Sequence, residues 1–184
     1  MTQTARDIAT LEALALQTAK LREEFRDTRL VPLPQVSDYA WLLTSINDAS
    51  TLVCDQITRT DGARDASRER DSYLYTLTRV AGYLTCAAAQ LGQGFTHLGY
   101  LHLAVHEPDT PARGERCATS TRQLHEAVRS SVQSLNLAHT ALSFEARQLA
   151  HKHQPDKPAQ GKPPAPATAL GSGPAATRAA RGRG

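Results

Sequence analysis

The sequence predicts an all-α protein, an antiparallel four-helix bundle with two long helices and a disordered C-terminal tail. Apolar residues recur at alternating steps of three and four through most of the first 152 residues, as expected of helices that pack on one another. Alanine and leucine, both strong helix formers, are abundant. Six of the ten prolines lie beyond residue 152, where the pattern stops. We assign residues 1–152 to a helical bundle domain and residues 153–184 to a disordered Pro/Ala/Gly/Arg-rich basic tail.

The first helix is predicted at about residues 4–28, where Leu11, Leu14, Leu21 and Phe25 lie on one face. It stops before the proline-containing segment 30–34, because proline has no N–H to donate and restricts the residue before it.

The second helix is predicted at about residues 38–60, with Ser37 or Asp38 as its N-cap. Its inner face contains Leu43, Ile46, Val53 and Ile57, and Leu52 is expected to widen that face. Trp41 is expected to be a large anchor at one end of the core. Asp61-Gly62 is a typical helix stop.

The third helix is predicted at about residues 64–106 as one continuous element. Its apolar seam comprises Leu74, Leu77, Ala81, Leu84, Ala88, Leu91, Phe95, Leu98, His102 and Val105. Thr85, Gly92 and Gly99 are seven residues apart and therefore share one side. Two interpretations of these glycines are open: close approach of another helix, or a hinge at Gly92–Gly94.

The fourth helix is predicted at about residues 111–152, with Thr110 as N-cap and Pro111 in the first turn. The short connection makes the third and fourth helices antiparallel. The predicted pairs are Leu98 with Thr121, Leu91 with Val128, Leu84 with Leu135, and Leu77 with Leu142. Their greater length predicts an arm beyond the first two helices, whose exposed seam would be a dimerisation surface.

The net charge of +3 is unevenly distributed. Six Lys/Arg residues against Asp156 give the segment from His151 onwards +5, which leaves residues 1–150 at −2. The bundle therefore has no broad basic footprint for nucleic acid. The three cysteines are odd in number, far apart and without a CxxC pair. These features, with no stretch of 18 apolar residues and no signal peptide, predict a cytoplasmic protein without a membrane segment.

Two histidines one helical turn apart, His102 and His106, form an HxxxH pair, and the antiparallel register brings Cys117 towards them. With Glu107 or Glu115 these side chains could form a tetrahedral zinc site. The alternative is polar or partly buried histidines, and HExxH, CxxC and the Glu-x-x-His pairs of di-iron bundles are missing. The sequence also has no GxSxG elbow and no P-loop. We therefore expect no enzyme activity and no cofactor.

A second stripe on the third helix is rich in tyrosine and amide side chains, which are common on recognition surfaces. This tyrosine stripe comprises Tyr75, Arg79, Tyr83, Cys86, Gln90, Gln93, His97 and Tyr100. It either faces the first or second helix or is exposed, and an exposed stripe is the predicted partner-binding face.

The tail ends with Arg178, Arg181 and Arg183 separated by glycine and alanine. Such arginines contact phosphates without specifying sequence, and the alternative is a solubilising tail. The sequence as a whole predicts a non-enzymatic helical-bundle interaction protein, an adaptor or structural subunit that self-associates, with a homodimer as one form. A nucleic-acid-associated accessory protein that uses the tail is the first alternative, and a metal-dependent bundle enzyme is the second.

Overall fold

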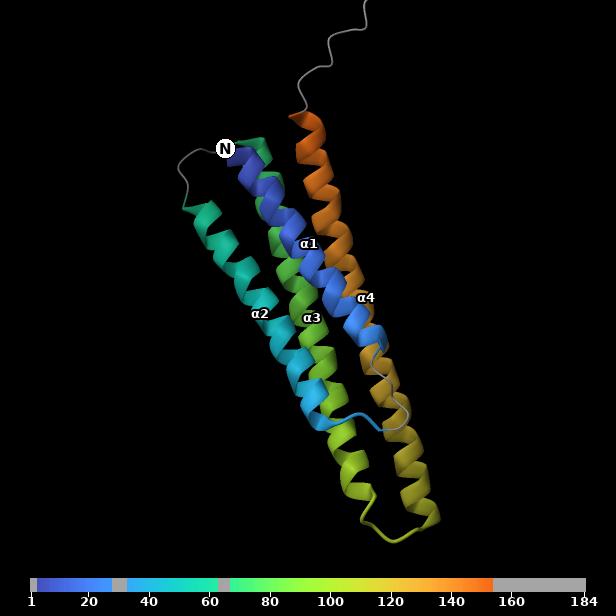
Figure 1. Cartoon of the computed structure of the whole chain (residues 1–184). Helices are drawn as coiled ribbons and strands as arrows, with labels where there is room; N and C mark the ends of the chain where they lie inside the picture. Colours follow the sequence, from blue (N-terminus) through green and yellow to red (C-terminus); the bar gives the residue numbers. More distant parts are fainter. Residues whose placement is uncertain (1–2, 28–32, 63–66, 154–184) are drawn as a thin grey trace, which may run out of the picture. The chain divides into compact units, whose positions relative to one another are not determined.

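The computed structural model describes residues 3–27, 33–62 and 67–153. In this part of the chain there are four helices and no strand: α1 (Gln3–Asp27), α2 (Val36–Asp61), α3 (Arg68–Ala104) and α4 (Pro111–Lys152) (Figure 1). The predicted all-α, four-helix architecture is confirmed. The predicted tail, residues 153–184, lies outside the described residues except for His153.

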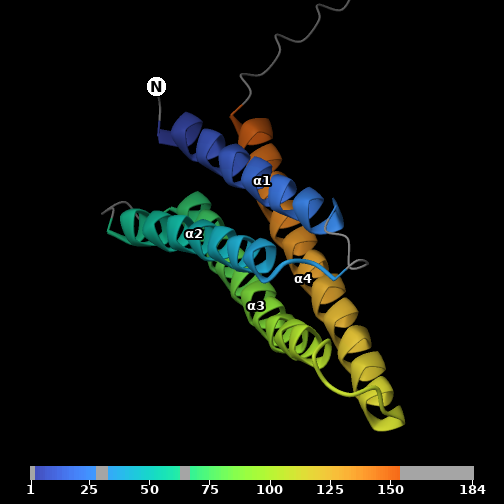
Figure 2. The ribbon, with the colours of Figure 1, turned by 60° about the horizontal axis from the view of Figure 1, so that its bottom comes forward.

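Each helix packs antiparallel on its neighbours. The interface between α3 and α4 is the largest, α1 packs on α4, α2 packs on α3, and α1 and α2 contact each other least. In Figure 2, α1 crosses in front of α4 and α2 lies in front of α3, so that the helices form two layers. The predicted arm is visible in Figure 1, where α3 and α4 extend beyond α1 and α2 at the end where they are joined.

The register between α3 and α4 agrees with the predicted pairs. The Ser131 hydroxyl donates to the Ala87 carbonyl oxygen at 3.1 Å, which falls between the predicted pairs Leu84–Leu135 and Leu91–Val128. A Cβ placed on Gly94 would lie 3.0 Å from the Cβ of Ala127, at the next level along the helices.

The buried face of α3 differs from the predicted seam in one column. Leu77, Leu84, Leu91 and Leu98 are fully buried, as predicted. The second buried column is Tyr73, Val80, Ala87, Gly94 and Leu101 instead of Leu74, Ala81, Ala88, Phe95 and His102. The reason is that α3 packs against two helices: the second column lies towards α4, while Ala81, Ala88 and Phe95 are partly buried on the other flank, where Phe95 meets Tyr39 of α2.

The helix ends confirm some predicted caps and correct others. Thr110 caps α4 by accepting a hydrogen bond from the Arg113 N–H, with Pro111 in the first turn, and α2 ends at Asp61 with Gly62 as C-cap. The prediction of Ser37 or Asp38 as N-cap of α2 is wrong: α2 begins at Val36, and Gln35 precedes it without a side-chain cap. The third helix begins at Arg68 rather than residue 64, because the Ser67 hydroxyl accepts from the Arg70 N–H and caps it. It ends at Ala104 rather than residue 106.

Two further predictions for α2 are wrong. Trp41 is 53% exposed and Leu52 is 50% exposed, so neither belongs to the core. The buried line of α2 is Tyr39, Leu42, Ile46, Ala49 and Val53. Tyr39, two residues before Trp41 and therefore on the opposite side of the helix, is the aromatic residue that fills that end of the core.

The interpretation that another helix approaches closely at Gly92 and Gly99 is wrong. A Cβ added at Gly92 or Gly99 would meet no atom within 4 Å among the described residues. Gly94 is the residue at the close approach, since its added Cβ would contact Ala127, Leu124 and Tyr39. The hinge at Gly92–Gly94 stays a prediction, and α3 is one unbroken helix through these residues.

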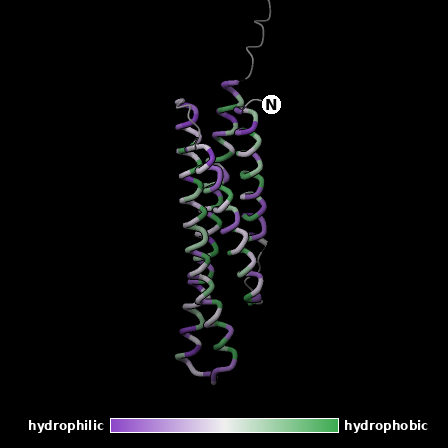
Figure 3. Tube along the Cα trace, turned by 90° about the vertical axis from the view of Figure 1, so that its left-hand side faces the viewer, coloured by the Kyte–Doolittle hydropathy of each residue, from purple (hydrophilic) through white to green (hydrophobic). Residues whose placement is uncertain are grey.

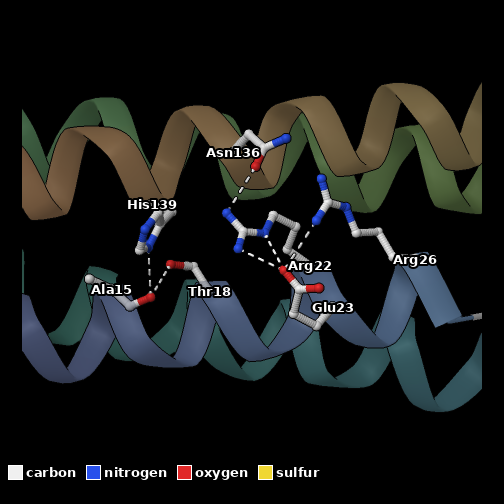
Figure 4. A network of polar contacts seen from close by, with 7 residues as sticks. All are labelled: Ala15, Thr18, Arg22, Glu23, Arg26, Asn136 and His139. Carbon is white, nitrogen blue, oxygen red and sulfur yellow. Dashed lines mark hydrogen bonds and ion pairs between the residues drawn. The ribbon is translucent and has the colours of Figure 1, made fainter.

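A polar network attaches α1 to α4 (Figure 4). His139 Nδ1 lies 3.0 Å from the Ala15 carbonyl oxygen, which also accepts a hydrogen bond from the Thr18 hydroxyl. Arg22 donates to Asn136 of α4 at 3.3 Å and pairs with Glu23 of its own helix.

Hydrophobic and hydrophilic residues are interspersed along each described helix (Figure 3). Leu98, Leu101 and Leu124 near the joined end of α3 and α4 are buried, so the prediction that the arm exposes its seam as a dimerisation surface is wrong except at Val105. Leu103 is also exposed there but does not belong to the predicted seam. Across the described residues, none of the helices combines the length and apolar character needed to cross a bilayer.

Candidate interaction face

The tyrosine stripe lies on the outer side of the α3/α4 pair. Ser134 of α4 donates to Gln90 at 3.2 Å, and Arg116 of α4 donates to the Tyr100 hydroxyl at 2.9 Å. The stripe therefore borders α4, on the flank of α3 opposite to the one that Phe95 presents to α2. Tyr75, Arg79, Cys86 and Gln93 are exposed, and Tyr83, Gln90, His97 and Tyr100 are half-buried.

An ordered cluster forms one end of the stripe. The Arg79 guanidinium lies 5.6 Å from the ring centre of Tyr75 and 5.7 Å from that of Tyr83, both within the range of cation–π attraction. It also donates a hydrogen bond of 2.7 Å to the Tyr83 hydroxyl, which raises the pKa of Arg79. Tyr75 is 64% exposed. The cluster thus presents two oriented aromatic rings and a cation to solvent.

The other end of the stripe is polar. A hollow of about 350 Å³ lies between α3 and α4 and is lined by Gln90, Gln93, His97, Gln123, Glu126, Ala127 and Ser130. Beyond it, Arg116 joins Tyr100 to Glu107 through hydrogen bonds of 2.9 and 3.1 Å. Amides and hydroxyls that both donate and accept suit a surface that adapts to a polar partner.

The sequence reasoning missed the α4 side of this face. Leu137 and Phe144 are exposed, and with Ser130 they recur every seven residues, so the three share one side of α4. Ser130 lines the hollow beside Gln90, which places Leu137 and Phe144 further along the same side. The signal was present in the sequence, because both residues fall two positions after the core leucines Leu135 and Leu142.

The predicted metal ligands are placed as follows. His102 Nε2 lies 3.0 Å from the carbonyl oxygen of Pro34, before α2. His106 is exposed in the turn after α3, and Cys117 is half-buried on α4. Among the described residues, no three or more His, Cys, Asp or Glu side chains gather in a group that could hold a metal ion.

The tail residues Arg178, Arg181 and Arg183, predicted to contact nucleic acid, lie outside the described residues. Comparison of the chain with protein-family models, curated proteins and solved structures found no match.

Proposed function

We propose that this chain is a non-enzymatic helical-bundle interaction protein, an adaptor or structural subunit that self-associates, and that the tyrosine stripe binds its protein partner. The observation that carries the proposal is the exposed Tyr75–Arg79–Tyr83 cluster. Tyrosine and arginine are enriched among residues that dominate binding energy. The Arg79 guanidinium lies over both rings and donates a 2.7 Å hydrogen bond to Tyr83. These contacts hold the three side chains in place, which reduces the entropy lost on binding.

Leu137 and Phe144 support the same assignment. Exposed large apolar side chains beside an ordered aromatic cluster are typical of the centre of an interface, and the amides at the polar end would form its rim. We place the protein in the cytoplasm, since its three cysteines are free and two of them, Cys54 and Cys86, are exposed as thiols.

The test is affinity purification from cells of the source organism, with the wild-type chain, Tyr83→Ala and Thr85→Ala as baits. Thr85 is exposed on α3 outside the stripe and is the matched control. We expect one or more proteins retained by the wild type and by Thr85→Ala, and reduced about 30-fold with Tyr83→Ala, the equivalent of a 2 kcal/mol hot spot. Equal retention by all three baits, or no retained protein, would contradict the proposal.

The nucleic-acid alternative rests on the charge of +5 after residue 150. Binding through the tail would weaken steeply with salt. A DNA or RNA titration at two salt concentrations, with the full chain and a chain ending at His153, tests it. Affinity that survives removal of residues 154–184 would show that the tail is not responsible.

A further inference from the structure

The side of the bundle formed by α1 and α2 is incompletely packed. These neighbouring helices contact each other least, and a groove of about 570 Å³ runs between them. Ala9, Ala13 and Leu14 of α1 and Leu52 of α2 line its apolar part, with Arg6 and Asp55 among the charged residues at its edges. In a closed four-helix bundle this fourth interface would be filled like the other three.

Large apolar side chains continue beyond the groove on the same two helices. Leu16 of α1 is 59% exposed and Trp41 of α2 is 53% exposed, and Leu52, in the groove itself, is 50% exposed. On α2, the exposed positions Trp41, Asp48 and Asp55 recur every seven residues, and Leu52 lies between the last two. Such spacing matches one side of a helix that packs against another helix.

Four exposed charges on the two helices are opposite in sign, two basic on α1 and two acidic on α2, although Arg59 of α2, which also lines the groove, is basic. Arg6 and Lys20 on α1 and Asp48 and Asp55 on α2 are exposed, and none of them forms an ion pair within the described residues. The groove brings residues 6 to 17 of α1 beside residues 52 to 59 of the antiparallel α2. Extending this register places Lys20 at the height of Asp48, and Leu16 at the height of Leu52, to within a helical turn.

We propose that a second copy of this chain covers the α1/α2 face, related by a twofold axis parallel to the helices. Such an axis keeps every residue at its own height and places α1 of each copy against α2 of the other. Lys20 then faces Asp48 of the second copy, and Leu16 faces its Leu52. The inference deepens the self-association in the proposed function, naming its face, and is independent of partner binding at the tyrosine stripe.

The size of the face suits a stable dimer. The 26-residue α2 is about 39 Å long, and two helices side by side are about 20 Å wide. The product, about 800 Å² for each copy, is that of a standard specific interface. Two symmetric sets of opposite charges around Leu16, Leu52 and Trp41 would give this interface its orientation.

The experiment is sedimentation velocity of the full chain from 1 to 200 μM at low salt. We expect a concentration-dependent dimer for the wild type. Lys20→Glu and Asp48→Lys each place like charges opposite one another twice per dimer, and we expect each to weaken dimerisation at least 10-fold. The double variant Lys20→Glu/Asp48→Lys exchanges the charges and should return the dimer Kd to within about threefold of the wild type.

Arg122→Glu replaces a positive charge by a negative one, as Lys20→Glu does, at an exposed position of α4. It should leave the dimer Kd unchanged. A monomeric wild-type chain at 200 μM overturns the proposal and leaves the face to a different partner. Equal weakening by Arg122→Glu, or a double variant that stays as weak as the single ones, also overturns it. The affinity purification with Tyr83→Ala measures partner binding at the tyrosine stripe and not dimerisation at the α1/α2 face. The two proposals can therefore fail separately.

Discussion

Alanine in place of Gly94 tests how closely α3 and α4 pack. An interior glycine costs a helix roughly 1 kcal/mol relative to alanine, so Gly92→Ala, whose new Cβ meets no described atom within 4 Å, should stabilise the protein by about that amount. At Gly94 the new Cβ would lie 3.0 Å from the Ala127 Cβ. Neither atom is the end of a flexible side chain, so the helices themselves must move apart.

Overpacking of this kind costs typically about 1–3 kcal/mol. We therefore expect the free energy of unfolding of Gly94→Ala to be about 1–3 kcal/mol lower than that of Gly92→Ala. Urea unfolding followed by circular dichroism measures both free energies. The double variant Gly94→Ala/Ala127→Gly removes the opposing methyl group and should show a favourable coupling energy. If Gly94→Ala stabilises as much as Gly92→Ala, the close packing of α3 on α4 at this level is refuted.

Three further predictions concern buried polar groups. Tyr39→Phe should be neutral or stabilising by up to about 1 kcal/mol, because the buried Tyr39 hydroxyl has no hydrogen-bond partner among the described residues; Tyr73→Phe, which loses the bond from Gln56, should instead cost about 1 kcal/mol in urea unfolding. Burial raises the pKa of Asp7 above its usual value, so the folded state keeps this proton to higher pH than the unfolded state. The free energy of unfolding therefore falls as pH rises through and above 3.8. Asp7→Asn should flatten that fall in melting curves between pH 3 and 7, and an unchanged pH profile would count against it. Glu145 is buried and accepts hydrogen bonds from two hydroxyls of α3, so Glu145→Ala should cost about 2–4 kcal/mol and Glu145→Gln clearly less.

The candidate interaction face could be found only in part from the sequence. The tyrosine stripe was identified by its composition and helical spacing, but the same spacing allowed it to face α1 or α2. Leu137 and Phe144 of α4, on the same face, were not predicted, because helical spacing places them outside the buried seam without showing which surface they join. Whether an apolar residue is buried depends on its angle to the neighbouring helix, which spacing alone does not give.

The sequence by itself determined the helices, their approximate limits and the pairing of α3 with α4. Local signals were sufficient for these: proline, Gly62 and Thr110 mark ends, and the leucines Leu77, Leu84, Leu91 and Leu98 mark the centre of a buried face.

Tertiary structure decided the edges of each buried face. Each helix in the bundle touches two neighbours, and the angle between them fixes how far burial extends around the helix. This angle buried Tyr39 rather than Trp41 and made Gly94 rather than Gly92 the point of close approach. It also left α1 and α2 apart, with a groove between them that helical spacing alone does not predict.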